Sequence, residues 1–444
     1  MAHPPQGGLP VHSPGPPDRS VQALAERALI WIGAAVYLFV LPQHIGGDAY
    51  ERFGSLENLM QHGSLGASRY SCIETLLSAP LWLAGRLAGN TALAVSFFNK
   101  LVFLLGLGAI HLLFRNRIDG RILRKLILLL MAASMFGYHV QNYNGDLLTA
   151  VLVCVGLASV AVGSETLGWV GLVLGVANAP ATFGGLVLAI LPGGRTARRA
   201  LKVIIPLAAC AALVLCESWV KRGSPFDSGY GNDHGYATVM PYSGLPGFSF
   251  PFFLGLISIL FSFGKGLVFF APGLLLLSKR PSNELPGAWK AFTLSSVLFV
   301  AGLVIVYSKW WAWYGGWSWG PRFFLFASIP ASMALAVHLS DRGAGLAMKL
   351  ATLVILAVSV WVGIDGAVFG QHGLEIGREN GFAQEYLVWY VPQWSALLRP
   401  FIDPKPLGAR DVAVIAYFAA AGFCLAAPTV AGVKAELVRR FRRK

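Results

Sequence analysis

The chain has 444 residues, of which 55% are hydrophobic and only 13% are charged, and its mean hydropathy is +0.61. This composition excludes an ordinary soluble domain, and apolar runs long enough to cross a bilayer recur along the whole chain. The net charge of +14 comes largely from short basic loops between these runs, which is typical of cytoplasmic loops, so no nucleic-acid partner is expected.

Residues 1–21 are rich in Pro and Gly and are expected to form a disordered cytoplasmic segment. They lack the basic start and apolar stretch of a secretory signal peptide, so the apolar segment 22–43 is expected to remain as a transmembrane anchor. The positive-inside rule then places the basic loops and the C-terminus in the cytoplasm. These stretches are RNRIDGRILRK (115–125), GGRTARRALK (193–202), SKRPSNELPGAWK (278–290) and KAELVRRFRRK (434–444).

The alternation of sides fixes how the next segments are interpreted. An odd number of crossings must separate Asp48, outside, from Arg115, inside. ETLLSAPLWLAGRLAG (74–89) is short and contains Pro80, so it is predicted to lie on the membrane surface, and residues 94–114 become the second span. The sequence therefore predicts an all-α polytopic membrane protein of about twelve spans with both termini inside. The other spans are expected at 124–140, 147–163, two short helices broken around 178–180 within 167–192, 200–219, part of 251–278, 290–308, 323–340, 345–366 and 411–431.

Two aspartates directly follow or begin apolar segments on the predicted outer side. Asp48 comes after Gly46 and Gly47 at the end of the first span, and Asp146 begins the fourth span in GDLLTAVL. An acid close to the membrane can act as a general base, because partial desolvation raises its pKa. The alternatives are a solvated loop acid for Asp48 and a helix N-cap for Asp146.

The loop GYGNDHGY (229–236) contains Asp233 and His234, but it has no spacing typical of metal ligands. No cofactor is therefore expected, and a divalent metal is possible but not indicated. Tyr230 could stack on a sugar ring, although tyrosines are also common at membrane interfaces.

The stretch SKWWAWYGGWSWGPRFF (308–324) is the most specific local pattern. Its glycines and Pro321 indicate a tight backbone next to a positioned cation, Arg322, and its aromatic faces suit sugar rings or isoprenoid chains. An arginine suits a phosphate through bidentate contacts. The alternative is an aromatic belt with an arginine that reaches the interface. Lys100 and Lys265 are lone cations in apolar surroundings, and such residues either reach the interface or pair with an anion.

With these residues in hand, the chain resembles the GT-C superfamily of membrane glycosyltransferases, and more narrowly the bacterial protein-mannosyltransferase and lipid A aminoarabinose transferase type. The resemblance is carried by GGDAYERFGSLENLMQHGSL, RYSCIETLLSAPLWLAG, FSFGKGLVFFAPGLLLL and WYGGWSWGPRFF. It implies a GT-C-like transmembrane catalytic module at 22–340, and residues 341–444 show no such resemblance. For those residues the apolar and charge pattern predicts C-terminal transmembrane helices with an outer loop at 341–431 and a basic cytoplasmic tail at 432–444. Ala49 stands where those families often have a second acid.

The resemblance also implies roles for individual residues. Asp48 and Asp146 are the expected catalytic acids, and Lys100, Lys265 and Arg322 are the expected ligands of the donor phosphate. The candidates for contacting the sugar or acceptor are Glu51, Arg52, Arg69, Tyr70, Tyr230, Trp313, Tyr314 and Trp317.

The expected function is an inverting glycosyltransferase of the bacterial inner membrane. It would move a sugar from a polyprenyl-phosphate donor to a cell-envelope acceptor (a glycolipid, polysaccharide or protein) on the periplasmic face. A flippase or transporter of lipid-linked glycans is the alternative from another class, because Lys100 and Asn178 place polar groups within apolar segments. An oligosaccharide ligase or polymerase is a second enzymatic alternative that differs in donor size.

Overall fold

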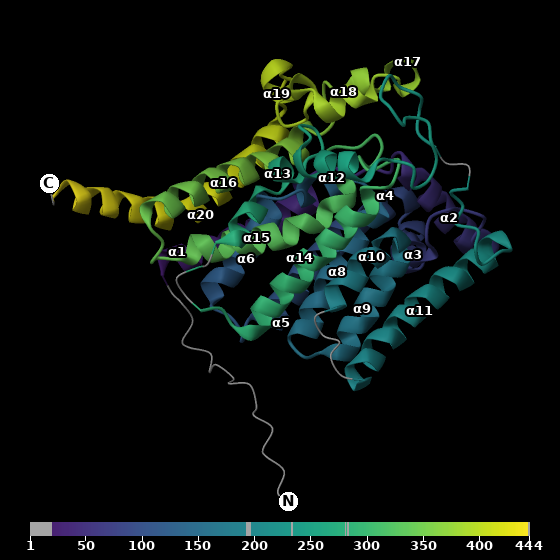
Figure 1. Ribbon diagram of the computed structural model, residues 1–444, viewed down its shortest axis with the longest axis horizontal. Helices are drawn as coiled ribbons and strands as arrows, with labels where there is room; N and C mark the ends of the chain where they lie inside the picture. Colours follow the sequence, from purple (N-terminus) through teal and green to yellow (C-terminus); the bar gives the residue numbers. More distant parts are fainter. Residues whose placement is uncertain (1–19, 192–196, 232–233, 280, 282–283, 443–444) are drawn as a thin grey trace, which may run out of the picture.

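The computed structural model describes residues 20–191, 197–231, 234–279, 281 and 284–442, and within these ranges it is a bundle of helices without a β-strand (Figure 1). Among the described residues, seven helical segments are long and apolar enough to cross a membrane. They are Val21–Val40, Thr91–Phe114, Val203–Arg222, Gly287–Tyr307, Arg322–Ser340, Leu346–Phe369 and Ala409–Phe441. Shorter apolar helices span Gly145–Ala161, Pro180–Ile190 and Phe252–Phe261. The predicted class, an all-α polytopic membrane protein, is confirmed, and the count of twelve spans stays a prediction.

The helices of the first half follow the expected order. They are α1 (Val21–Ala35), α2 (Asp48–His62), α3 (Cys72–Leu87), α4 (Thr91–Ser96), α5 (Phe98–Phe114), α6 (Gly120–Ala132), α7 (Phe136–His139), α8 (Gly145–Ala161), α9 (Glu165–Asn178), α10 (Phe183–Ile190) and α11 (Ala197–Arg222). The predicted break at residues 178–180 lies between α9 and α10. The N-terminal segment predicted to be disordered falls, up to residue 19, outside the described residues.

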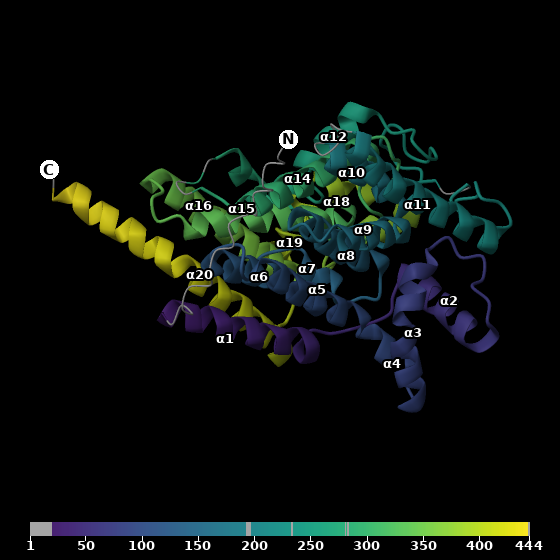
Figure 2. The same ribbon diagram turned by 90° about the horizontal axis from the view of Figure 1, so that it is seen from below.

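The first loop carries helices of its own, as expected for residues 46–89. Figure 2 shows α2, α3 and α4 grouped at one end of the bundle, away from α1. Pro80 lies inside α3, and the side-chain hydroxyl of Ser71 caps this helix by accepting a hydrogen bond from the Ile73 amide. The segment therefore forms one capped, continuous helix despite its proline.

The closest helix pair in the first half, α8 against α9, is built on glycines. A Cβ atom at Gly168 would lie 2.9 Å from the carbonyl oxygen of Gly156, and one at Gly156 would lie 2.8 Å from Leu172 Cγ. Small residues let two backbones approach closely, which is the usual way that helices associate in a membrane. This packing holds α8, the helix that begins beside Asp146, against α9.

The second half contains four long helical segments and a cap of short helices. Its helices are α12 (Phe252–Phe261), α13 (Leu267–Phe270), α14 (Gly287–Tyr307), α15 (Ser328–Ser340), α16 (Leu346–Ile364), α17 (Glu379–Phe382), α18 (Glu385–Tyr390), α19 (Arg399–Ile402) and α20 (Ala409–Phe441). Figure 1 shows α17, α18 and α19 together at one edge, above α12 and α13. The basic tail expected from residue 432 continues α20 as far as Phe441.

Two of the long helices end in a π-helical turn. Residues Val36–Val40 continue α1, and residues Asp365–Phe369 continue α16. A π-turn contains one more residue than an α-helical turn, and such turns are frequent at functional sites. The first one leads directly into the loop that ends at Asp48.

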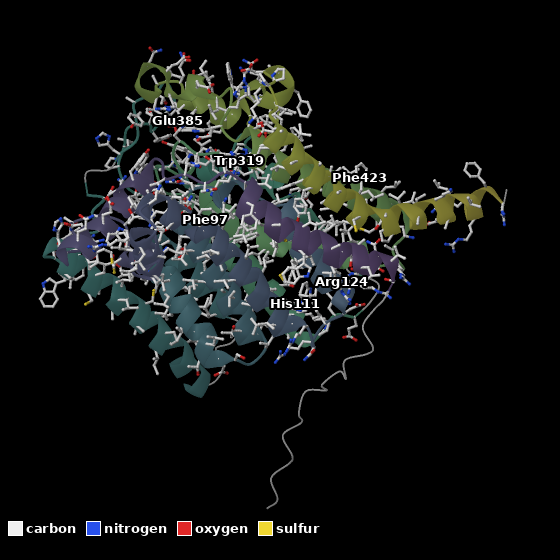
Figure 3. The ribbon with its side chains drawn as sticks, turned by 180° about the vertical axis from the view of Figure 1, so that it is seen from behind. Phe97, His111, Arg124, Trp319, Glu385 and Phe423 are labelled. Carbon is white, nitrogen blue, oxygen red and sulfur yellow. The ribbon has the colours of Figure 1, made fainter. Side chains whose placement is uncertain are left out.

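Figure 3 shows the two ends of the bundle. Phe97, Trp319 and Glu385 lie toward one end, which we call the site end, whereas His111 and Arg124 lie toward the other, which we call the basic end. At the basic end, buried Glu26 of α1 accepts from Arg124 Nε at 2.7 Å and from Lys125 Nζ at 2.5 Å. This ion cluster joins α1 to α6. The side of the membrane on which each end lies stays a prediction.

Candidate active site

Asp48 lies at the start of α2 because the preceding backbone turns sharply. Gly47 has a φ of +59°, a conformation that favours glycine, and α2 begins at the next residue. The carboxylate of Asp48 therefore lies in the first turn of a helix, where the helix dipole favours a negative charge.

A reciprocal pair of hydrogen bonds brings the loop before Asp48 against the turn that precedes α8 and Asp146. Asn142 Nδ2 donates to the carbonyl oxygen of Gly46 at 3.1 Å, and the amide of Gly46 donates to Asn142 Oδ1 at 3.1 Å. The backbone adds bonds from the His44 amide to the Gln141 carbonyl oxygen at 2.9 Å and from the Tyr143 amide to the His44 carbonyl oxygen at 3.3 Å. Two loops that are far apart in the sequence are thus joined side by side.

Arg322 lies between the two aspartates. Its Nη1 is 3.1 Å from Asp48 Oδ2, and its Nε is 3.9 Å from Asp146 Oδ2. The three side chains are partly accessible, with exposed fractions of 36% for Asp48, 24% for Asp146 and 25% for Arg322. The site therefore holds a cation shared by two carboxylates that an incoming ligand can reach.

A second arginine, Arg52, lies next to this group of Asp48, Asp146 and Arg322. Arg52, one turn along α2 from Asp48, is 2.6 Å from Glu74 Oε2, and its guanidinium lies over the ring of Tyr70 at 4.1 Å from the centroid. It also interacts electrostatically with Asp146. Glu74, on α3, is almost completely buried. Acidic and basic side chains therefore alternate through the site, in the order Glu74, Arg52, Asp146, Arg322, Asp48.

Asn178 connects this charged row to the helix break. Its side-chain oxygen accepts from the Glu74 amide at 3.2 Å, and its amide nitrogen donates to the carbonyl oxygen of Gly145 at 3.1 Å and to Thr149 Oγ1 at 3.0 Å. The broken segment after α9 thus serves to hold the start of α3 against the start of α8. Asn178 is 3% exposed and its side chain is hydrogen-bonded on both sides. This structural role accounts for a polar residue in an apolar segment, and no transport pathway is needed to explain it.

The ionisation of Asp48 is set by its neighbours. Burial would raise the pKa of Asp48, but Arg322 and a hydrogen bond from the Tyr70 hydroxyl outweigh it and hold this pKa below its usual value. Burial, reinforced by the charge on Asp48, raises the pKa of Tyr70, so Tyr70 keeps its proton as a donor. Asp48 is therefore an ionised, hydrogen-bonded carboxylate at neutral pH.

The other predicted residues fall into two groups. Glu51, Arg69 and Tyr230 join the cluster: Arg69 Nε is 3.9 Å from Glu51 Oε2, and the Arg69 guanidinium lies 5.2 Å from the ring centroids of both Tyr70 and Tyr230. With Asp48, Asp146, Arg322 and Arg52, they form one continuous patch at the site end. The sequence therefore predicted most of the residues that the fold brings together, and their roles stay predictions.

The remaining five lie apart from this patch. Lys100 donates to the Leu41 carbonyl oxygen at 2.6 Å and to Gln43 Oε1 at 2.7 Å. Lys265 is occupied by backbone carbonyl groups of the glycine-rich loop. Trp313 and Tyr314 are buried and contact Trp389, and the partly exposed Trp317 contacts Phe382.

Sequence reasoning did not assign a role to Glu74, Asn142 or Asn178, which hold the charged row and its two loops in place. Glu74 and Asn178 interrupt apolar stretches, and this was the available signal. For Asn142, by contrast, nothing in QNYNGD distinguishes the residue that bonds to Gly46. Among the described residues, no group of three or more His, Cys, Asp and Glu side chains is placed to bind a metal ion.

The arrangement of helices matches solved membrane enzymes. ArnT from Cupriavidus metallidurans, a lipid A aminoarabinose transferase, superposes in its apo state with a TM-score of 0.51 and 14% identity, over 92% of this chain and 77% of that chain. The structure of the same protein bound to undecaprenyl phosphate gives a TM-score of 0.52 with the same identity and coverage. The chain has the GT-C fold.

The order of elements expected from the sequence is present: a long apolar helix, Asp48, the helices α2 and α3, and then a second long apolar segment, Thr91–Phe114. Their placement at the membrane surface stays a prediction. The oligosaccharyltransferase of Archaeoglobus fulgidus also matches, at a TM-score of 0.39 and 13% identity over 91% of this chain and 64% of that one, a similarity too low to support an argument. No protein-family model and no curated protein sequence matches the chain.

Proposed function

We propose that this chain is an inverting glycosyltransferase that uses a sugar linked to polyprenyl phosphate and acts on the extracytoplasmic face of the membrane. The observation that carries the proposal is the position of Arg322 between the accessible carboxylates of Asp48 and Asp146. A cation shared by two acids can bind a phosphate, and an ionised acid beside it can accept a proton. The structure of ArnT with undecaprenyl phosphate supports a lipid-linked donor for this fold.

The proposed reaction is a single displacement. The oxygen of an acceptor hydroxyl attacks the anomeric carbon of the sugar while Asp48 takes the hydroxyl proton. The bond between the anomeric carbon and the phosphate oxygen breaks, and its electron pair leaves on polyprenyl phosphate. Arg322 stabilises the charge that develops on that oxygen. Attack opposite to the leaving group inverts the configuration of the sugar.

The same arginine would link donor binding to the strength of the base. In the structure, Arg322 holds the pKa of Asp48 down, which makes this carboxylate a weak base. A donor phosphate bound to Arg322 would share its charge, so the pKa of Asp48 would rise toward values at which proton transfer is more efficient. Asp146, also beside Arg322, would keep the guanidinium in place during this exchange.

The experiment is turnover by the purified protein in detergent. Undecaprenyl-phosphate-linked monosaccharides are supplied one at a time with an envelope lipid and glycan extract, and released undecaprenyl phosphate is measured by mass spectrometry. We expect release with at least one donor, and a decrease of about 10²-fold to 10⁴-fold in Asp48→Asn, the range for loss of a general base. Glu57→Gln, further along the same helix and outside the patch, is the matched control and should retain most of the activity.

The outcomes separate the alternatives. A flippase would not consume its substrate in detergent, where there are no two sides to move between. An oligosaccharide ligase or polymerase would release undecaprenyl phosphate or diphosphate only from donors that carry an oligosaccharide. Unchanged turnover in a folded Asp48→Asn variant would exclude Asp48 as the base.

A further inference from the structure

The glycine-rich loop before Arg322 is wrapped around the ammonium group of Lys265. Lys265 Nζ donates to the carbonyl oxygen of Ser318 at 2.6 Å and of Gly320 at 3.0 Å, and the carbonyl oxygen of Gly316 lies at 3.5 Å. Lys265 is 3% exposed. A buried ammonium group thus holds three carbonyl groups of one loop, and the last of them is two residues from Arg322.

The glycines of the loop make this arrangement possible. Gly316 has a φ of +66° and Gly320 a φ of +58°, both in the left-handed region that favours glycine. A Cβ atom at Gly320 would also lie 3.0 Å from the ring of Phe270. The backbone is therefore free to turn these carbonyl groups inward, and it leaves the loop by way of Pro321 with the Arg322 amide bonded to the Gly320 carbonyl oxygen at 3.2 Å.

The charge that faces Lys265 comes from the C-terminal outer segment, for which the sequence predicted no role. Glu385, the first residue of α18, is 3% exposed and interacts electrostatically with Lys265. Burial raises the pKa of Glu385 to about 7, and Lys265 and a hydrogen bond from the Tyr314 hydroxyl group oppose this rise and favour the carboxylate. Tyr314 lies at the start of the same glycine-rich stretch. Figure 3 shows Glu385 at the site end.

Helix α18 is fixed to the segment that carries Lys265. The Gly264 amide donates to the Trp389 carbonyl oxygen at 3.0 Å, and a Cβ atom at Gly264 would collide with the Val388 carbonyl oxygen. Ser395 Oγ donates to the Phe263 carbonyl oxygen at 2.7 Å. The ring of Trp389 stacks on Tyr314 with centroids 3.9 Å apart. Residues 263–265 therefore lie between α18 and the glycine-rich loop, with contacts to both.

From these contacts we propose that Glu385 is a positioning residue for the transfer reaction: it supplies the counter-charge for Lys265, which holds residues 316–320 so that Arg322 lies between Asp48 and Asp146. This inference rests on the proposed function for its effect on catalysis. The effect of Glu385 on the conformation of residues 316–320 rests only on the contacts described above. Segment 370–408 would thus support the active site indirectly, through Lys265 and the glycine-rich loop, without contacting the substrate.

The charges around Lys265 determine what removal of Glu385 does. Burial lowers the pKa of Lys265 and Glu385 opposes this, whereas Arg322, also nearby, lowers it further. His139 on α7 is a third titratable group that interacts electrostatically with both Lys265 and Arg322. Replacing Glu385 with glutamine therefore makes Lys265 lose its proton at a lower pH, and the neutral amine cannot hold three carbonyl groups.

The test compares Glu385→Gln with Glu375→Gln, which neutralises an exposed acid of the same outer segment. Hydrogen–deuterium exchange of the purified proteins should show faster exchange in peptides covering residues 314–322 for Glu385→Gln alone. Turnover of the donor should fall about tenfold to a hundredfold, the range expected when a catalytic group is misplaced by about 1 Å. The alkaline limb of the pH–rate profile should move to lower pH, so that acidification narrows the deficit.

Each result decides a separate point. Unchanged exchange at residues 314–322 in Glu385→Gln would overturn the holding role. Faster exchange with the wild-type turnover and pH profile would overturn the link to catalysis. If the wild type turns over no donor, the proposed function fails. The two variants are then compared by their affinity for undecaprenyl phosphate. Equal affinities in Glu385→Gln and Glu375→Gln would exclude an effect of Glu385 on the phosphate site.

Discussion

Replacement of Arg322 by glutamine is expected to destabilise the protein in a way that depends on pH. The change removes the guanidinium 3.1 Å from Asp48 Oδ2 and 3.9 Å from Asp146 Oδ2 and leaves two carboxylates facing each other. Exposed ion pairs contribute about 0.2–1 kcal/mol, and breaking a fully buried pair costs about 3–5 kcal/mol. Because Arg322 is 25% exposed, we expect a loss of about 1–3 kcal/mol in the free energy of unfolding at pH 7.

The sign of the pH dependence follows from Asp48. Its pKa is lower in the folded protein, so its stabilising interaction is fully present above the pKa of the unfolded chain, about 4, and is lost as the pH falls through the folded value. Thermal denaturation in detergent should therefore separate wild type from Arg322→Gln between pH 5 and 7, and the difference should shrink below about pH 4. Arg378→Gln, at an exposed arginine, is the control. A difference of the same size at every pH would refute the reasoning.

Three further results are expected. Asn142→Ala removes both hydrogen bonds to the backbone of residue 46 and should cost about 1–3 kcal/mol in stability together with a loss of turnover, measured by thermal denaturation and donor release. Glu26→Gln leaves two buried basic side chains without their carboxylate and should lower the free energy of unfolding by about 3–5 kcal/mol. Turnover per folded molecule should stay unchanged, because this cluster lies at the basic end. A loss of turnover larger than the loss of folded protein would contradict this. The acid limb of kcat/KM for the free enzyme should lie below the usual aspartate range near pH 4, since the pKa of Asp48 is lowered, and an acid limb near pH 6 would contradict this assignment.

Asp48, Asp146 and Arg322, which the sequence predicted as site residues, lie together in the structure, whereas Lys100 and Lys265, predicted with them, lie apart. Asp48, Asp146 and Arg322 each lie at the boundary of an apolar segment, and the alternation of basic loops assigns all three boundaries to the same side. The chain has few charged residues, so charged side chains at the ends of apolar segments on the same side of the membrane have few other charged partners available. The membrane class and the presence of a separate helix near residues 74–89 follow from the same pattern of apolar length and charge.

The roles of Lys265, Trp313 and Tyr314 within the fold could not be read in this way. Each was identified as a candidate for ligand contact because it is a cation or an aromatic near the predicted outer face. In the structure their partners are backbone carbonyl groups and α18, which lies far away in the sequence. The pattern of residues 370–408 gives no period or motif that would place it against the glycine-rich loop. Contacts between two irregular segments depend on their backbone course, which composition does not specify.

The π-helical turn at residues 36–40 determines the direction in which the chain leaves the first span. Each residue in a helix advances the chain by about 100° around the axis, so one residue more or fewer before Leu41 would redirect the loop to Asp48 by that angle. Removing a single valine from this turn would convert it to an ordinary α-helical turn, with little change in the burial of α1. The number of residues in this short stretch, rather than its composition, would then decide whether Asp48 lies beside Arg322. Single-residue deletions, each paired with a compensating insertion, would show at which positions this length matters.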